Sequence, residues 1–423
     1  MENTENKIPN SENQDTQNSS FFSESISSSN GLEPFPKLRF LEFKNTYKKI
    51  KLNKAVERIQ RKDPTSEAPV MMLSAASGFI MQSEKYSREN AGQSLKKYIL
   101  LKKGELAYNH GASKYKPFGC CFELKEEEAR IPYVYHCFAV KENNDKSYIA
   151  RLLNNQKIDQ QLKRLISSSV RMDGLLNISY EEYTGIDLYL PSLPEQQKIA
   201  AFLSLVDVRI EKQRKLVENL KKYKRGLLSC IFDNKLIGEN WKKYKLSSIL
   251  KERSTYSEKD GSYEHVTLSR DGIIPKTERY NRDFLVSSEN KKYKITKMGD
   301  ICYNPANMKF GVICLNTYGN AIFSPIYITF EIKSDFDKPF VGLYMTRNDF
   351  INRSLKFQQG TVYERMAVSP EDLLSMDIEL PNLEVQKRIS NIFTILDKKI
   401  VRENNIFNEL QKMKRALLQQ MFI

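Results

Sequence analysis

The stretch PSLPEQQKIAAFLSLVDVRIEKQRKLVENLKKYKRGLLSCIF, at residues 191–232, decides the fold because the chain carries it twice. The second copy, PNLEVQKRISNIFTILDKKIVRENNIFNELQKMKRALLQQMF, occupies residues 381–422, at a constant offset of 190 residues and without a gap. Thirteen of the 42 aligned pairs are identical. Self-similarity at a fixed offset is typical of a duplicated structural unit. We therefore analyse the chain as two copies of one unit.

Each copy predicts one long helix. Ser192 and Glu195 predict a capping box at the start of the first helix. From there, mostly apolar residues recur at alternating spacings of four and three, as in a coiled-coil seam. We expect each helix to extend over about 37 residues, or about 55 Å, and the two helices to pair as an antiparallel coiled coil with the globular parts at opposite ends. The seam positions are Ile199, Leu203, Val206, Ile210, Gln213, Val217, Leu220, Lys224, Leu227 and Ile231 in the first copy, and Ile389, Phe393, Leu396, Ile400, Glu403, Phe407, Leu410, Lys414, Leu417 and Met421 in the second.

The similarity continues upstream of each helix, in short blocks that keep their order. YKKIKL (47–52) matches WKKYKL (241–246), KKGELAYN (102–109) matches KMGDICYN (297–304), and IPYVYHCFAVK (131–141) matches SPIYITFEIK (324–333) with one gap. Several blocks are rich in β-branched and aromatic residues, which favours strands, whereas SYIARLLNNQKIDQQLKRLI has helical spacing. The predicted fold class is therefore α/β (α+β), with two mixed α/β domains separated by the two paired helices.

Composition divides the chain further. Residues 1–33 are polar and carry a net charge of −5, so we expect a disordered acidic tail. The whole chain carries +15, which leaves +20 for the remainder and favours a polyanionic partner. The predicted domains are the tail at 1–33, globular domains at 34–190 and 233–380, and spacer helices at 191–232 and 381–423.

Length, cysteines and apolar runs exclude several classes of protein. With 423 residues and 40% hydrophobic content, the chain can form two or three folded domains. No apolar run is long enough to cross a membrane and no secretory signal is present, so a cytoplasmic location is expected. The six cysteines form no C-x-x-C pair and only three histidines are present, which argues against a zinc site and indicates reduced thiols.

The order of the parts from PKLRF (36–40) to the C-terminus resembles the DNA-specificity subunit of type I restriction–modification systems. Each copy has a Tyr or Trp five residues before a Leu, a K-x-G-[DE] strand start and a late [IV]-S-x-[ED]-[DE] turn at 178–182 or 368–372. Each then carries P-x-L-x-x-Q, D-x-x-I and K-R-x-L-L in its helix. The second copy departs from the usual Glu-Gln pair with Val385-Gln386.

The resemblance implies that each globular part is a target recognition domain reading one half of a bipartite, asymmetric site in double-stranded DNA. The helices would space the two domains and dock two modification (methyltransferase) subunits, with restriction (endonuclease/translocase) subunits joining the complex. The chain itself would be non-catalytic and hold no cofactor. S-adenosylmethionine, ATP and Mg²⁺ would serve the partner subunits.

Candidate base and phosphate contacts follow from residue chemistry. Arg and Lys suit guanine and phosphates, whereas Asn and Gln suit adenine. The candidates lie on polar loops after matching strands, near the end of the first domain, and in the segment KFQQGTVYER. They are Asn109, His110, Ser113, Lys114, Lys116 and Arg171 in the first domain, and Asn304, Asn307, Lys309, Gln358, Gln359, Thr361, Tyr363 and Arg365 in the second. For each of them the alternative is a solvated loop residue without DNA contact.

Catalytic patterns are weak. Asn304-Pro305-Ala306-Asn307 only approaches an adenine-methyltransferase motif, and no phosphate-binding G-x-x-x-x-G-K-[ST] loop occurs. Asp300 with Glu331-x-Lys333 could hold Mg²⁺ as an autonomous nuclease, but Ala139 replaces Glu331 in the first copy. A third hypothesis is a coiled-coil scaffold that binds nucleic acid without sequence choice. The basic clusters 221–225 and 412–415 either complement the helix C-termini or dock a partner subunit.

Overall fold

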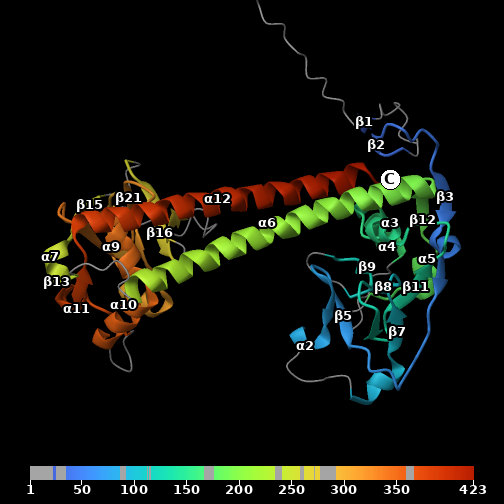
Figure 1. Cartoon of the computed structure of the whole chain (residues 1–423), viewed down its shortest axis with the longest axis horizontal. Helices are drawn as coiled ribbons and strands as arrows, with labels where there is room; N and C mark the ends of the chain where they lie inside the picture. Colours follow the sequence, from blue (N-terminus) through green and yellow to red (C-terminus); the bar gives the residue numbers. More distant parts are fainter. Residues whose placement is uncertain are drawn as a thin grey trace, which may run out of the picture. The chain divides into compact units, whose positions relative to one another are not determined.

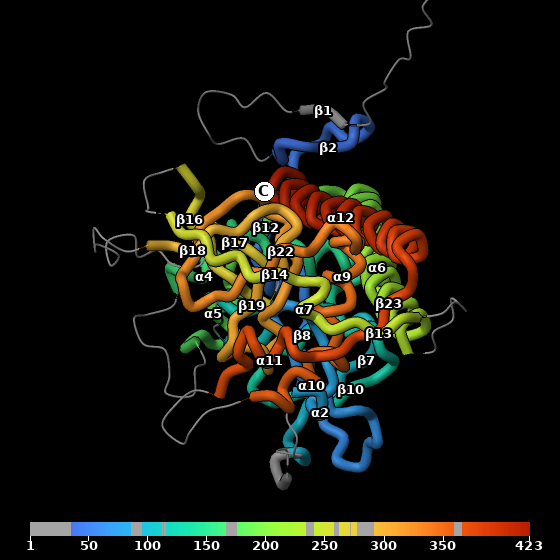
Figure 2. Tube along the Cα trace, turned by 90° about the vertical axis from the view of Figure 1, so that its left-hand side faces the viewer, coloured from blue at the N-terminus to red at the C-terminus, as the bar shows by residue number. Residues whose placement is uncertain are grey.

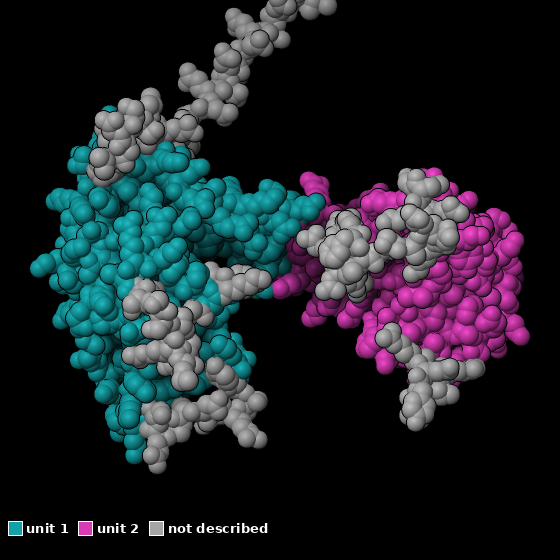
Figure 3. Space-filling model, turned by 180° about the vertical axis from the view of Figure 1, so that it is seen from behind, with its two compact units in different colours: residues 1–214, 405–423 teal, residues 215–404 magenta. Residues whose placement is uncertain are grey.

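The computed structural model describes residues 22–24, 35–85, 92–111, 113, 116–165, 176–233, 241–257, 262–270, 272–276, 292–358 and 366–423. The chain forms two compact units (Figure 3): unit 1 comprises residues 1–214 and 405–423, and unit 2 comprises residues 215–404. The acidic tail predicted at 1–33 lies outside the described residues, except for a short strand, β1 (Phe22–Glu24), which pairs with β2 (Leu38–Phe40). Each long helix is shared between the units, and the predicted domain boundaries stay a prediction.

Unit 1 is built on a four-stranded antiparallel sheet in the order β4-β11-β8-β9 (Figure 1). Its further elements include four two-stranded sheets and several short helices. In chain order the described elements are β3 (Lys48–Lys51), α1 (Leu52–Ala55), β4 (Val56–Arg58), β5 (Met71–Ser74), β6 (Gly78–Met81), α2 (Gln82–Lys85), η1 (Gly92–Lys97), β7 (Ile99–Lys102), β8 (Leu106–Asn109), β9 (Cys120–Glu123), β10 (Glu128–Ile131), β11 (His136–Val140), α3 (Lys146–Leu152), α4 (Gln156–Leu165), α5 (Tyr180–Thr184) and β12 (Asp187–Leu190).

Unit 2 repeats this design with the sheet β14-β22-β19-β20, beside a five-stranded sheet in the order β15-β18-β21-β16-β17. Its described elements are β13 (Lys242–Lys245), α7 (Leu246–Ile249), β14 (Leu250–Glu252), β15 (Tyr256–Ser257), β16 (Glu264–Ser269), β17 (Gly272–Pro275), β18 (Tyr293–Thr296), β19 (Ile301–Tyr303), η3 (Pro305–Phe310), β20 (Ile313–Leu315), β21 (Ala321–Phe323), β22 (Ile328–Ile332), α9 (Lys338–Met345), α10 (Asn348–Ser354), η4 (Leu355–Phe357), α11 (Pro370–Ser375) and β23 (Asp377–Leu380).

The internal duplication extends to strand register. Phe138 lies opposite Leu106 in unit 1, and Phe330 lies opposite Ile301 at the matching positions of unit 2. The strand before each four-stranded sheet pairs with the strand before each long helix, as β3 with β12 and β13 with β23. The predicted mixed α/β fold with two long helices is confirmed.

The two long helices are α6 (Leu193–Asp233) and α12 (Leu383–Gln420), which run side by side (Figures 1 and 2). Within unit 1 the first half of α6 packs against the last part of α12, and Lys414 Nζ lies 2.6 Å from Asp207 Oδ1. Within unit 2, Lys224 Nζ lies 2.5 Å from Asp397 Oδ1. These two ion pairs join repeat-equivalent residues, because each partner is offset by 190 from its counterpart. The helix halves are therefore antiparallel in each unit.

Two side chains of the repeated motif tie each helix to its globular part. Gln196 accepts a hydrogen bond from the backbone N–H of Asp145 and donates one to the carbonyl of Pro191, and Gln386 makes the same pair of bonds with Asp337 and Pro381. Asp145 and Asp337 cap the N-termini of α3 and α9. Each glutamine therefore links the start of one of these helices to the start of α6 or α12. This explains the glutamine of P-x-L-x-x-Q in structural terms.

The aromatic residue near the end of each repeated segment closes a core. Phe422 packs on Tyr148 with 5.1 Å between ring centroids, and Phe232 packs on Phe340 at 5.4 Å. Each hydrophobic core therefore contains the start of one long helix and the end of the other. Neither unit completes its core from one continuous stretch of chain.

The capping box predicted at Ser192 and Glu195 is wrong in the role it gives to Glu195. The carboxylate of Glu195 is 1% exposed and accepts hydrogen bonds from Arg39 Nε and Nη2, both at 2.8 Å, and from the Tyr47 hydroxyl. A buried guanidinium–carboxylate fork is a stronger partner than a helix N-terminus. Val385 stands at this position in the second copy, in an apolar setting.

Within the described residues, no helix combines the length and apolarity that are needed to cross a bilayer.

Candidate nucleic-acid interface

Unit 2 contains a groove of about 1190 Å³ beside the long helices. Its lining comes from the turn η3, strand β20, the β16–β17 hairpin, the start of α10 and the Lys224–Asp397 ion pair. Three cationic side chains, Lys224, Arg270 and Lys309, line the groove against one carboxylate, that of Asp397. The groove therefore has a positive balance, as a polyanion site requires.

Three of the candidate DNA contacts meet in this groove. Asn304 is largely buried and its side-chain oxygen accepts a hydrogen bond from the backbone N–H of Ala306, which begins the 3-10 turn. Asn307 and Lys309 follow on that turn, and both line the groove. Asn304 thus shapes the turn, whereas Asn307 and Lys309 present their side chains to the groove.

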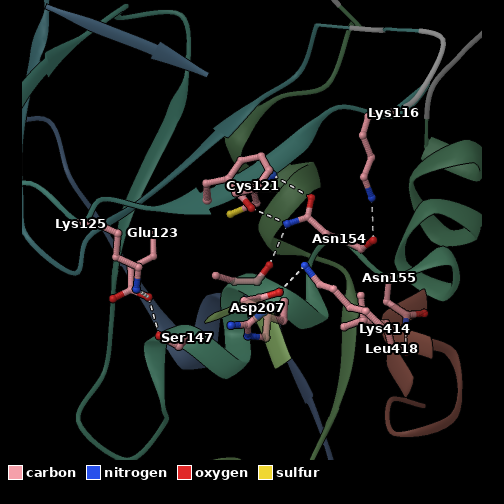
Figure 4. A pocket seen from close by; sticks show the side chains of 13 residues that line it. Lys116, Cys121, Glu123, Lys125, Ser147, Asn154, Asn155, Asp207, Lys414 and Leu418 are labelled. Carbon is pink, nitrogen blue, oxygen red and sulfur yellow. Dashed lines mark hydrogen bonds and ion pairs between the residues drawn. The ribbon is translucent and has the colours of Figure 1, made fainter. Parts of the chain in front are cut away.

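Unit 1 has a smaller pocket of about 360 Å³ at the equivalent position (Figure 4). Asp207 lies between two cations in it, with Arg151 Nη1 at 2.8 Å and Lys414 Nζ at 2.6 Å. Lys116 points toward Asn154 and donates to its backbone carbonyl at 2.8 Å. The two cavities are equivalent because the Asp207–Lys414 and Asp397–Lys224 pairs line them and β9 or β20 forms a wall.

Other candidates in unit 1 shape the loop after β8. Asn109 accepts a hydrogen bond from the backbone N–H of Gly111 at 2.9 Å, and Ser113 Oγ accepts one from the backbone N–H of Lys116. His110 is buried, with Nδ1 2.8 Å from the carbonyl of Leu176 and Nε2 2.9 Å from that of Val134. Both ring nitrogens of His110 are therefore engaged within the protein, and His110 has no ring nitrogen available to contact DNA in this conformation.

Six candidates lie outside the described residues, and their contact with DNA stays a prediction. They are Lys114, Arg171, Gln359, Thr361, Tyr363 and Arg365. Gln358 is described and donates a hydrogen bond from Nε2 to the carbonyl of Met366 at 2.9 Å, which joins the two ends of segment 359–365.

A stack of aromatic and imidazole rings supports the loop of unit 1. Tyr108 stacks on Tyr183 with centroids 3.8 Å apart, and His110 stacks on His136 at 5.1 Å. Burial lowers the pKa of His136 to about 4, so the ring is neutral near pH 7. His136 therefore supplies no positive charge to a phosphate at that pH, and it fits a structural role.

The carboxylate considered for a nuclease has a different partner. Asp300 is 1% exposed and accepts Arg253 Nε at 2.7 Å and Nη2 at 3.0 Å, together with the backbone N–H of Lys297. Glu331 lies 3.3 Å from the same guanidinium. The first copy repeats this arrangement, with Arg61 paired to Glu105 and Glu105 accepting the backbone N–H of Lys102. The acidic residue of K-x-G-[DE] is thus a structural anchor.

Among the described residues, no group of three or more His, Cys, Asp or Glu side chains is arranged to hold a metal ion. Burial raises the pKa of Cys120 to about 11 and that of Cys302 to about 12, so both thiols are protonated and unreactive near pH 7. The cysteines that the structure describes are not joined by disulfides.

Sequence reasoning missed several groove residues. Ser269 and Arg270 reach the groove from the β16–β17 hairpin, and Asn348 and Asn352 reach it from α10. The sequence around these four residues contains no motif or spacing that would indicate a binding role. Phe310 was also missed, although the signal was present: Lys-Phe-Gly at 309–311 matches Lys-Pro-Phe-Gly at 116–119 in the first copy.

Comparisons with known proteins agree with this geometry. The family model for the type I restriction modification DNA specificity domain matches residues 238–412. A Methanocaldococcus jannaschii protein, assigned as the specificity subunit of the type I restriction enzyme MjaX, is 23% identical over 290 residues. That match covers 64% of this chain and 66% of the relative, slightly under two thirds of its length.

A solved structure has the same fold. The type I restriction–modification S subunit from M. genitalium superposes with a TM-score of 0.56 at 14% sequence identity, covering 92% of this chain and 99% of that one. The chain therefore resembles type I restriction–modification specificity subunits in the sequence of residues 238–412 and in its fold.

The structural role of Asp300 can be tested by unfolding. We expect Asp300→Asn to lower the free energy of unfolding of unit 2 by about 2–4 kcal/mol, because it leaves the largely buried Arg253 guanidinium without its carboxylate. The chain has one tryptophan, Trp241, so its fluorescence during urea denaturation reports on unit 2.

Glu331→Gln is the matched control, because its side chain is half-exposed and its removal should change the unfolding free energy by less than about 0.5 kcal/mol. The anchor role would be wrong if Asp300→Asn kept full stability but abolished Mg²⁺-dependent DNA cleavage by the purified chain.

Proposed function

We propose that the chain recognises a bipartite, asymmetric site in double-stranded DNA, with unit 1 reading one half-site and unit 2 the other. The observation that carries this proposal is the duplication of a basic groove within a duplicated fold. Each cavity has one of the two repeated Asp–Lys ion pairs in its lining, but the cavities differ in volume, about 360 Å³ against 1190 Å³, and in their other lining residues. Different linings on a common scaffold suit two unlike half-sites.

Affinity would come from phosphate contacts. The residues after the acidic tail carry a net charge of +20. Each Lys or Arg that neutralises a phosphate steepens the salt dependence of binding by about 0.9 in log–log terms. Such contacts carry little sequence information.

Specificity would come from the side chains that face the cavities. In unit 2 these include Asn307, Lys309 and Arg270, which match the chemistry of adenine and guanine edges. In unit 1, Lys116 lies at the pocket. The loop candidates outside the described residues would complete each contact surface.

The partners we propose are the modification and restriction subunits of a type I system. Those subunits would transfer methyl groups from S-adenosylmethionine and cleave DNA with ATP and Mg²⁺, at a cytoplasmic location. Two copies of the modification subunit fit the duplicated helices best, because the helices present two exposed apolar patches that share the repeat-equivalent pairs Leu205/Ile395 and Met413/Tyr223.

Each patch lies within one unit and joins both helices. Patch 1 is formed by Leu205 and Val208 of α6 with Met413 of α12, and patch 2 by Ile392 and Ile395 of α12 with Tyr223 of α6. Leu205 is 70% exposed and its repeat counterpart Ile395 is 60% exposed. The Asp207–Lys414 ion pair sets the register of the two helices, in which Val208 lies at the same level as Met413 along the helix axis. Clustered exposed apolar side chains on long helices favour a protein partner.

Lys224 and Lys414, from the two basic clusters, are engaged in the ion pairs between the helices. Their neighbours Arg225 and Arg415 are exposed and flank the patches. The clusters therefore support helix pairing directly, and their exposed members extend the proposed docking surface.

The patches predict the stoichiometry of the complex. We expect Leu205→Asp with Val208→Asp to remove one modification subunit, and Ile392→Asp with Ile395→Asp to remove the other, because a buried aspartate at a partner interface remains unpaired. Native mass spectrometry of the co-purified complex would show one partner copy for each double variant and none for the combination.

Val401→Glu is the matched control, since Glu211 occupies the equivalent position in the first copy. It should retain both partner copies. Loss of both copies from either double variant alone, with the chain still folded, would contradict independent equivalent patches.

The DNA site itself is best tested by single-molecule methylome sequencing. Cells that express the chain with its modification partner should gain one methylated motif made of two unlike half-sites around an unspecified gap. Cells that express the partner alone should lack this motif. A scaffold without sequence choice predicts no new motif and equal competition by scrambled duplexes, and that result would overturn the proposal.

A further inference from the structure

Phe310 is the side chain of the unit 2 groove that the DNA-contact chemistry above leaves unexplained. It lies at the end of η3, lines the groove and is 61% exposed. Ile326 lines the same groove and is 63% exposed, whereas the other large apolar side chains of the lining are less exposed. A phenyl ring in the polar groove has few protein neighbours to pack against.

The turn that carries Phe310 is held rigidly. Met308, two residues earlier, is fully buried in the core of unit 2. Asn304 caps the start of the turn, and Gly311 ends it with a φ of +74°, a left-handed conformation that favours glycine. The backbone N–H of Gly311 donates to the carbonyl of Met308 at 2.9 Å. The ring is therefore presented from a fixed backbone.

The corresponding phenylalanine of unit 1, Phe118, is packed against the core instead of exposed. Phe118 precedes Gly119, whose φ is +83°, and it packs against the core of unit 1. The carbonyl of Phe118 also accepts a hydrogen bond from the Tyr108 hydroxyl at 2.6 Å. The equivalent tyrosine of unit 2, Tyr303, donates instead to the carbonyl of Val368. The equivalent turns therefore place the phenylalanine against the core in unit 1 and in the groove in unit 2.

The charge around the ring indicates the kind of ligand. The ammonium of Lys309 lies 5.1 Å from the Phe310 ring centroid, and Arg270 and Lys224 line the same groove. An aromatic face among cations is the combination that binds nucleic acid by base stacking together with phosphate neutralisation. An apolar protein segment would gain nothing from these three charges.

We propose that Phe310 stacks on a base of the half-site read by unit 2 and locally unstacks that base from its neighbour. This proposal rests on the DNA-recognition function proposed above. It makes Phe310 a specificity-determining residue of unit 2 alone, because Phe118 is packed in unit 1. Unstacking depends on the base step, so the ring adds sequence preference without hydrogen bonds.

The test uses the full chain with its modification partner and duplexes that carry the methylated motif. 2-Aminopurine is placed in turn at positions of each half-site, because its fluorescence rises when the base is unstacked. We expect a rise on binding at a position in one half-site. Phe310→Ala should abolish it and weaken binding roughly 10- to 100-fold. Phe310→Tyr, which keeps the aromatic face, should retain both the signal and the affinity.

Met298→Ala is the control, since Met298 is an exposed apolar residue of unit 2 outside the groove lining. Met298→Ala should retain the fluorescence rise and the DNA affinity of the unaltered chain. Circular dichroism checks that each variant is folded. The proposal is overturned if Phe310→Ala keeps the fluorescence rise and the affinity, or if Phe310→Tyr loses them as Phe310→Ala does.

Failure of the underlying function has a different signature. The unaltered chain with its partner would then show no methylated motif and no preference for one duplex over a scrambled one. A normal motif combined with wild-type behaviour of Phe310→Ala would overturn the stacking proposal alone.

Discussion

The antiparallel packing of two helix segments that lie about 200 residues apart in sequence is the constraint on which the rest of the structure depends. Each hydrophobic core is completed by the start of one helix and the end of the other, with Phe422 in unit 1 and Phe232 in unit 2. The repeated Asp–Lys pairs fix the register, and Gln196 and Gln386 fix each helix to its globular part. A unit can therefore fold fully only when both helices are present.

The departures between the copies show where one scaffold carries two different sets of side chains. Glu195 binds Arg39 and Tyr47, whereas Val385 at the same position joins an apolar core. Phe118 packs inward, whereas its counterpart Phe310 remains in the groove. The anchors of the fold are kept, and the lining of the cavities differs. This pattern fits a protein whose two halves have the same architecture and different ligands.

Much of this fold could be predicted from the sequence, because periodicity and repetition report directly on which faces are buried. The long helices, the strands around Cys302 and the pairing of the copies follow from such patterns. Long-range polar partners do not. Arg39 lies 156 residues from its partner Glu195, and Arg253 lies 47 residues from its partner Asp300. The sequence does not reveal these arginine partners, so it predicts a capping role for Glu195 and a possible Mg²⁺-binding role for Asp300. The sequence predicts that His110 is a polar loop residue, because residue spacing cannot reveal its two backbone carbonyl partners.

Our central proposal is that the paired helices act as a spacer between two DNA-reading units. It is tested most directly by inserting four residues into both helices, after Lys215 and after Asn405, which the Asp–Lys register brings opposite each other. The insertion lengthens each helix by about 6 Å, close to two base pairs at about 3.4 Å each. Methylome sequencing should return both original half-sites with a gap about two base pairs longer. An active variant that methylates sites with the original gap would contradict the account.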